Sequence, residues 1–111
     1  MSTSQATVDF ITDQLTKIGN IRSRKMFGEY ALYCDEKVVA LICDDQLFVK
    51  ITTAGRGMIK VLKEAPPYPG AKPYFLIDED GIEDREWLTA FIRATADDLP
   101  QPKPKKPTSK K

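Results

Sequence analysis

Three short apolar runs, separated only by polar turns, set the strongest limit on what this chain can fold into. The runs are residues 30–34, 38–43 and 46–51, and the turns between them contain Asp35-Glu36-Lys37 and Asp44-Asp45. Two parallel strands need a crossover connection of a dozen residues or more, whereas turns this short join antiparallel strands. The segment therefore predicts three antiparallel strands joined by hairpins, with the central run as the most deeply buried.

Two segments with helical periodicity flank these strands. Between residues 4 and 18 the apolar side chains recur in steps of three and four, and Gly19-Asn20 can end the helix. A second amphipathic helix is predicted to begin near Asp84, a favourable N-cap, and to bury the stripe that starts at Trp87. We expect Trp87, the only tryptophan in the chain, to pack on the sheet.

Shorter elements connect the two halves. Thr52-Thr53 can cap a short helix in which Met58, Ile59 and Leu62 share one face. A proline-rich irregular loop follows it, and residues 73–77 then form a further strand.

Taken together, the pattern predicts an α+β fold. We expect a two-layer domain: an antiparallel sheet of about five strands, a short helix between strands, and the N- and C-terminal helices packed on one face. The domain is expected to span residues 1–99, followed by a disordered Pro/Lys-rich tail, residues 100–111. Residues 1–99 hold 12 of the 17 Lys and Arg and all 16 Asp and Glu, a balance of −4, while the tail holds five lysines.

The composition argues against catalysis and metal binding. No histidine is present, so the commonest general base and the commonest metal ligand near neutral pH are both missing. Two cysteines, Cys34 and Cys43, are too few for a structural zinc site. We interpret them as buried thiols, with a disulfide as the alternative if a hairpin brings them close. The sequence predicts a protein that is not an enzyme and has neither cofactor nor metal.

The expected compartment is the cytoplasm, with no membrane association. The longest apolar run is far shorter than the roughly 20 residues that span a bilayer. Residues 1–10 show neither a basic start nor an apolar signal core, so nothing in them predicts export.

The segment RKMFGEYALYCDEKVVALICDDQLFVK, residues 24–50, resembles the TfoX N-terminal domain family, which is also met in Sxy competence regulators. The likeness consists of an Arg-x-Met-Phe-Gly motif, a Tyr-rich strand ending in an acidic turn, an apolar strand, and Asp-Asp-x-Leu-Phe-x-Lys. Pro73-Tyr74-Phe75 and IEDREWLTAFIRATA are similar to later parts of the family pattern. The resemblance covers about residues 8–98.

The resemblance implies a small regulatory or protein-interaction domain, linked to transcriptional or competence regulation. Its partner would be an unidentified protein or, in a homodimer, a second copy. A nucleic-acid-binding accessory protein that uses the basic tail is the alternative. Residues of the family motif that are candidate partner contacts are Arg24, Lys25, Met26, Phe27, Gly28, Tyr30 and Lys50.

Two interpretations of the positive charges in this motif stay open. On a strand, Arg24 and Met26 share one face and Lys25 lies on the other. We expect Arg24 to pair with an acidic neighbour and Lys25 to be exposed; contact with an anion or a partner is the alternative. Gly28 can permit a bulge or a positive-φ turn between two strands.

The charge distribution generates a first prediction. Because residues 1–99 are net acidic, they should not bind duplex DNA at low salt, and any weak binding by the full chain should come from its tail and fall as salt rises. A fluorescence titration of both forms measures this. Micromolar, strongly salt-dependent binding by residues 1–99 alone would contradict the prediction.

Overall fold

The computed structural model describes residues 3–26, 29–60 and 62–100. One antiparallel sheet contains β1 (Ile21–Met26), β2 (Glu29–Cys34), β3 (Lys37–Cys43), β4 (Gln46–Val49), β5 (Glu64–Ala65) and β6 (Tyr74–Ile77), in the spatial order β1-β2-β3-β4-β6-β5. The helices are α1 (Gln5–Gln14), the 3₁₀ turn η1 (Thr16–Ile18), α2 (Thr53–Arg56), α3 (Glu79–Glu83) and α4 (Arg85–Asp98). The predicted α+β class is confirmed. The sheet has six strands, rather than about five, because the two-residue β5 adds an edge.

Two rows of cross-strand neighbours define the faces of the sheet. One row runs Lys25, Tyr30, Ile42, Leu47 and Ile77, and the four residues after Lys25 belong to the same buried cluster as side chains of α1 and α4. The other row runs Arg24, Ala31, Leu41, Phe48 and Leu76, and none of these belongs to that cluster. Because side chains alternate along a strand, the helices cover the first face only. We call the second face the open face.

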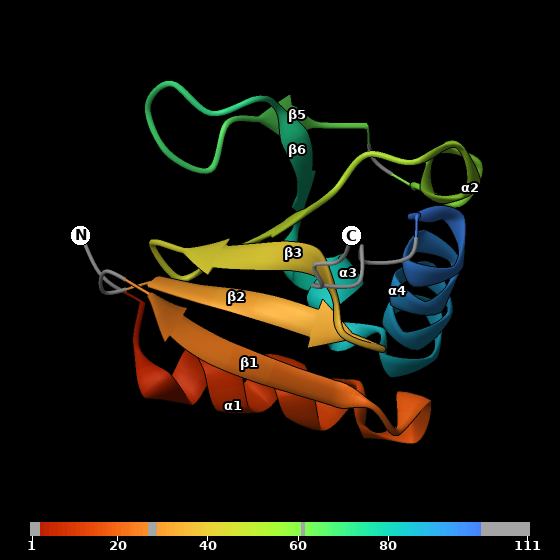
Figure 1. Cartoon of the computed structure of the whole chain (residues 1–111), viewed down its shortest axis with the longest axis horizontal. Helices are drawn as coiled ribbons and strands as arrows, with labels where there is room; N and C mark the ends of the chain where they lie inside the picture. The colour runs from red at the N-terminus through yellow and green to blue at the C-terminus, as the bar shows by residue number, and fades with distance from the viewer. Residues whose placement is uncertain (1–2, 27–28, 61, 101–111) are drawn as a thin grey trace, which may run out of the picture.

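Both long helices contribute their apolar stripes to the covered face, as predicted. Figure 1 shows α1 running beside β1, with α4 near the end of the sheet where β2 meets β3. Ile11 and Leu15 of α1 and Phe91 of α4 are fully buried there. Trp87 is partly buried against this core, stacks on Phe91 with ring centroids 4.7 Å apart, and donates its indole N–H to the Met58 carbonyl at 3.0 Å.

The two tight hairpin turns are tied to the helices. Asp35, Glu36, Asp44 and Asp45 all have positive φ, a conformation that two-residue hairpins of this twist require. The Asp35 carboxylate accepts hydrogen bonds from Arg93 of α4 at 3.0 Å and from Asn20 at 3.2 Å. The acidic residues of the turn therefore also anchor the hairpin.

At the β3–β4 turn, Asp45 makes the corresponding link to α1. Its carboxylate accepts from the Ser4 backbone N–H at 2.8 Å and the Thr7 hydroxyl at 2.9 Å. These bonds, the Ser4 N–H first, hold the pKa of Asp45 below its usual value. Ser4 also caps α1, since its hydroxyl accepts from the Thr7 N–H.

Lys37, the residue directly after the β2–β3 turn, links this hairpin to α4. A bulge at Val39 pairs Lys37 with Cys34 and so places it on the covered face. The buried Lys37 ammonium donates to the carbonyls of Ala96 at 2.7 Å and Leu99 at 3.1 Å. The last carbonyls of a helix have no partner within the helix, so Lys37 caps α4.

Two connections differ from the sequence prediction. The short helix ends at Arg56, before Met58 and Ile59, because Gly55 and Gly57 favour helix poorly. Leu62 remains exposed instead of sharing an apolar helix face. After the predicted strand at residues 73–77, the chain forms a helix that the sequence analysis did not include: the Asp78 carboxylate caps α3 by accepting from the Gly81 N–H at 2.9 Å.

The cysteines are both free and buried, as the thiol interpretation expects. Cys34 lies beside the β2–β3 turn on the covered face, whereas Cys43 ends β3 beside the next turn. Six residues of strand separate the Cys34 partner from Cys43, about 20 Å. The disulfide alternative is therefore wrong.

The cap on α4 can be tested directly. Lys37→Met keeps the aliphatic length but removes the ammonium donor from the Ala96 and Leu99 carbonyls, so unfolding in urea should require about 1–3 kcal/mol less free energy. The exposed Lys17→Met variant is the matched control and should stay within about 0.5 kcal/mol of the unmodified chain. Equal urea midpoints for Lys37→Met and the unmodified chain would contradict the capping role.

Candidate functional site

An apolar groove crosses the open face at one end of the sheet. Its volume is about 610 Å³, and its lining residues are Met26, Glu29, Tyr30, Leu41, Cys43, Pro67, Tyr68 and Tyr74. The strands β1, β2 and β3 supply the floor, and the connection between β5 and β6 supplies one wall. Figure 1 shows this connection extending over the end of the molecule where β1 ends and β2 begins. We call this site the open-face groove.

The proline-rich loop between β5 and β6 forms one wall of the groove. Prolines remove backbone donors and fix φ, so residues 66–69 cannot continue β5. The loop turns back at Gly70, whose φ is +89°, and the Ala71 N–H donates to the Tyr68 carbonyl at 3.1 Å. This geometry leaves Tyr68 56% exposed beside Met26, which is 40% exposed.

The titratable groups at the base of the groove, Cys43 and Tyr74, are neutral near pH 7. Burial raises the pKa of the Cys43 thiol to about 11, so this thiol is neutral near pH 7 and a poor nucleophile. Burial also raises the pKa of Tyr74. At the rim, the Glu29 carboxylate accepts from the Thr3 hydroxyl at 2.6 Å and the Asp44 N–H at 3.1 Å. The groove therefore offers apolar surface with polar groups at its edge.

The positive charges of the family motif lie along β1, beside the groove. Arg22 pairs with Glu36 at 2.8 Å and lies over the Tyr33 ring, 4.4 Å from its centroid. Arg24 and Lys25 are exposed. Across the described ranges, no ion pair includes either of them. The pairing that the sequence suggested for Arg24 forms two residues earlier, at Arg22.

Of the other motif residues, Tyr30 also lines the groove, although its side chain belongs to the covered face. Tyr30 is buried, and its hydroxyl donates to the Gln5 side chain of α1 at 2.9 Å. Lys50 is partly buried after β4, where its backbone N–H donates to the Val39 carbonyl at 2.9 Å, away from the residues that line the groove. Phe27 and Gly28 lie outside the described residues.

The structure adds residues that sequence reasoning did not single out. Pro67 and Tyr68 are distant in sequence from the motif, and only the pairing of β6 with β4 brings their loop over the open face. Exposed aromatic and proline residues in a loop were the available signal. Leu41 and Tyr74 were recognised as strand residues but not as part of a site.

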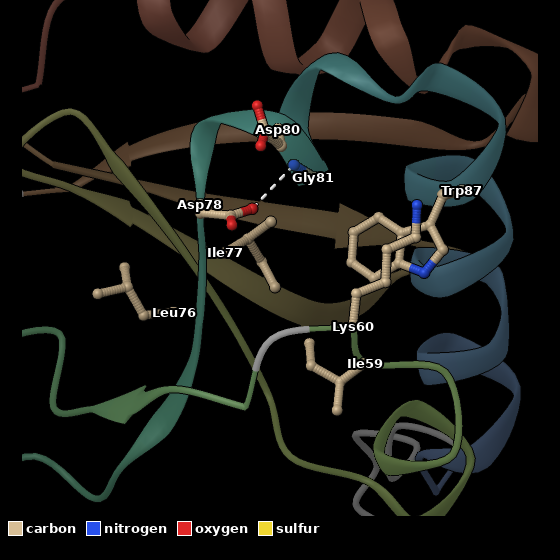
Figure 2. A pocket seen from close by; sticks show the side chains of 8 residues that line it. All are labelled: Ile59, Lys60, Leu76, Ile77, Asp78, Asp80, Gly81 and Trp87. Carbon is tan, nitrogen blue, oxygen red and sulfur yellow. Dashed lines mark hydrogen bonds between the residues drawn. The ribbon is translucent and has the colours of Figure 1, made fainter.

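A second, smaller hollow of about 280 Å³ lies where β6, α3 and α4 meet. Figure 2 shows Lys60 beside Trp87 at its mouth, and the Lys60 ammonium is 2.8 Å from the Asp84 carboxylate. The hydrogen bonds from Lys60 and then the Trp87 N–H lower the pKa of Asp84. Since Asp84 caps α4, its ion pair with Lys60 has a structural role here.

Residues 3–26, 29–60 and 62–100 contain no group of three or more Cys, Asp or Glu side chains placed to hold a metal ion. Within those ranges, no helix has the length and apolar character needed to cross a membrane.

Comparison with known proteins shows which proteins this chain is similar to. Residues 13–99 match the TfoX N-terminal domain family. A curated relative from Spirochaeta aurantia, described as an uncharacterized 12.7 kDa protein in the trpE 5' region, is 42% identical over 110 residues, which cover 99% of this chain and 95% of the relative. The chain therefore belongs to the TfoX N-terminal domain family.

Proposed function

We propose that this chain is a regulatory domain that acts by binding a protein partner in the open-face groove, without catalysis. The observation that carries the proposal is the uncovered apolar groove, in which Met26 and Tyr68 expose 40% and 56% of their surface. Exposed apolar surface next to polar groups is typical of protein interaction sites. Aromatic residues and methionine are enriched at the centres of such interfaces.

The chemistry of the groove supports binding over reaction. Its thiol is neutral near pH 7, and its carboxylate already accepts hydrogen bonds from Thr3 and Asp44. Membership of the TfoX N-terminal domain family supports a regulatory role. On that family likeness we assign the regulated process to transcription or competence. We assign the protein to the cytoplasm, where its two free thiols would stay reduced.

Variants of the exposed groove residues test this function. Met26→Gln combined with Tyr68→Ser removes apolar surface from the groove while leaving the buried core unchanged. Phe10→Ser, at a 46% exposed position on α1 outside the groove, is the matched control. All three proteins should melt within about 0.5 kcal/mol of one another, since surface substitutions away from special features change stability little.

The readout is quantitative affinity capture from an extract of the cells that make the protein. We expect a specific set of proteins to be enriched by the unmodified chain and by Phe10→Ser, and depleted at least tenfold with the groove variant. The same purified partner should then show this order in a binding titration. Undiminished capture by a folded groove variant would show that the groove is not the binding site.

A further inference from the structure

The sheet has one long unpaired edge, and it belongs to β1. On one side, all six residues of β1 pair with β2. Within the described ranges, no strand pairs with its other side, because β1 ends the strand order. The opposite edge of the sheet is β5, only two residues long. A free strand edge presents a row of backbone N–H and C=O groups to which another extended segment can add.

The charged side chains of β1 determine which extended segments can pair favourably with this edge. Arg24 projects on the open face and Lys25 on the covered face, and both are exposed. Arg22 shares its charge with Glu36, whereas Arg24 and Lys25 have no acidic partner among the described residues. An incoming strand therefore meets a positive charge on each of its faces.

A second copy of β1 fits this edge poorly. Antiparallel addition of two β1 strands would bring their arginines and lysines close to one another, and like charges on neighbouring strands are destabilising. Acidic side chains at the same positions would be attracted instead. Adjacent strands lie about 4.8 Å apart, close enough for charge-assisted contacts between neighbouring side chains.

The open-face groove begins where this edge ends. Met26 is the last residue of β1 and also lines the groove. An added strand has alternate side chains on the open face, so a segment that continues past Met26 can place an apolar side chain against Met26, at the edge of the groove.

We propose that β1 accepts an extended acidic segment of a partner protein by β-strand addition, with its carboxylates facing Arg24 and Lys25 and an apolar residue in the open-face groove. This inference rests on the proposed function and adds the partner's chemistry: a negatively charged strand that ends in a hydrophobic residue.

Synthetic peptides test the proposal on the full isotope-labelled chain by NMR. The parent probe is a ten-residue peptide that carries Glu in adjacent pairs separated by Val, so that carboxylates lie on both strand faces, and that ends in Leu-Phe; its control has Lys in place of Glu. We expect the acidic peptide to bind at least tenfold more tightly than the control and to weaken as salt rises. Shift changes should centre on residues 21–26, whose amides should exchange more slowly in the complex.

Backbone methylation of the peptide separates strand addition from simple charge attraction. Every second amide of an added strand points at β1, so N-methylation of that set should abolish binding while methylation of the other set preserves it. Equal binding by both methylated peptides would show that no strand is added and would overturn the proposal.

Matched protein variants locate the binding. Arg24→Gln combined with Lys25→Gln should weaken the acidic peptide about tenfold, while Lys17→Gln, an exposed lysine on η1, should leave it unchanged. If the double variant binds as tightly as the unmodified chain, the peptide is on another basic segment and the proposal is wrong. Concentration-dependent dimers that protect residues 21–26 would assign the edge to a second copy and overturn it equally.

The two proposals fail separately. Loss of partner capture in the groove variant, without any binding of the acidic peptide, would support the proposed function and reject strand addition. Peptide binding at β1, together with undiminished partner capture by the groove variant, would support strand addition and reject the groove as the partner site.

Discussion

The fold depends on one imbalance: a six-stranded sheet has two faces, and the helices of this domain cover only one. The cross-strand row through Ile42 and Leu47 is buried under α1 and α4, whereas the row through Leu41 and Phe48 lies on the other side. A proline-rich loop covers part of that second face and leaves the groove. The arrangement that builds the core therefore also produces the candidate binding surface.

Polar contacts at the ends of the hairpins fix the helices in register with the sheet. Asp45 holds the start of α1, Asp35 contacts Arg93 of α4, and Lys37 caps the end of α4. Each contact comes from a tight turn or from the residue directly after it, where positive φ and short length limit the side-chain directions. The hairpins and helices thus reinforce one another.

Sequence patterns were sufficient for the α+β class, the hairpins and the two main helices, because each depends on local periodicity and short turns. They were insufficient where distant segments meet. The loop with Tyr68 reaches the groove only through the pairing of β6 with β4, and Lys37 reaches α4 only because a bulge turns it to the covered face. The wrong extent of the helix after Thr53 has a local cause, two glycines whose cost the apolar spacing obscured.

The central claim is that the open-face groove of the free protein is accessible, and carbene footprinting of the full chain tests it most directly. The carbene labels side chains in proportion to their exposure. Met26 and Tyr68 should therefore be labelled about as strongly as Phe10, while the fully buried Phe91 should remain unlabelled. Strong labelling in the groove is the result that the account predicts. Labelling of Met26 and Tyr68 as weak as that of Phe91 would contradict it, because the face would then be covered by the chain itself or by a second copy.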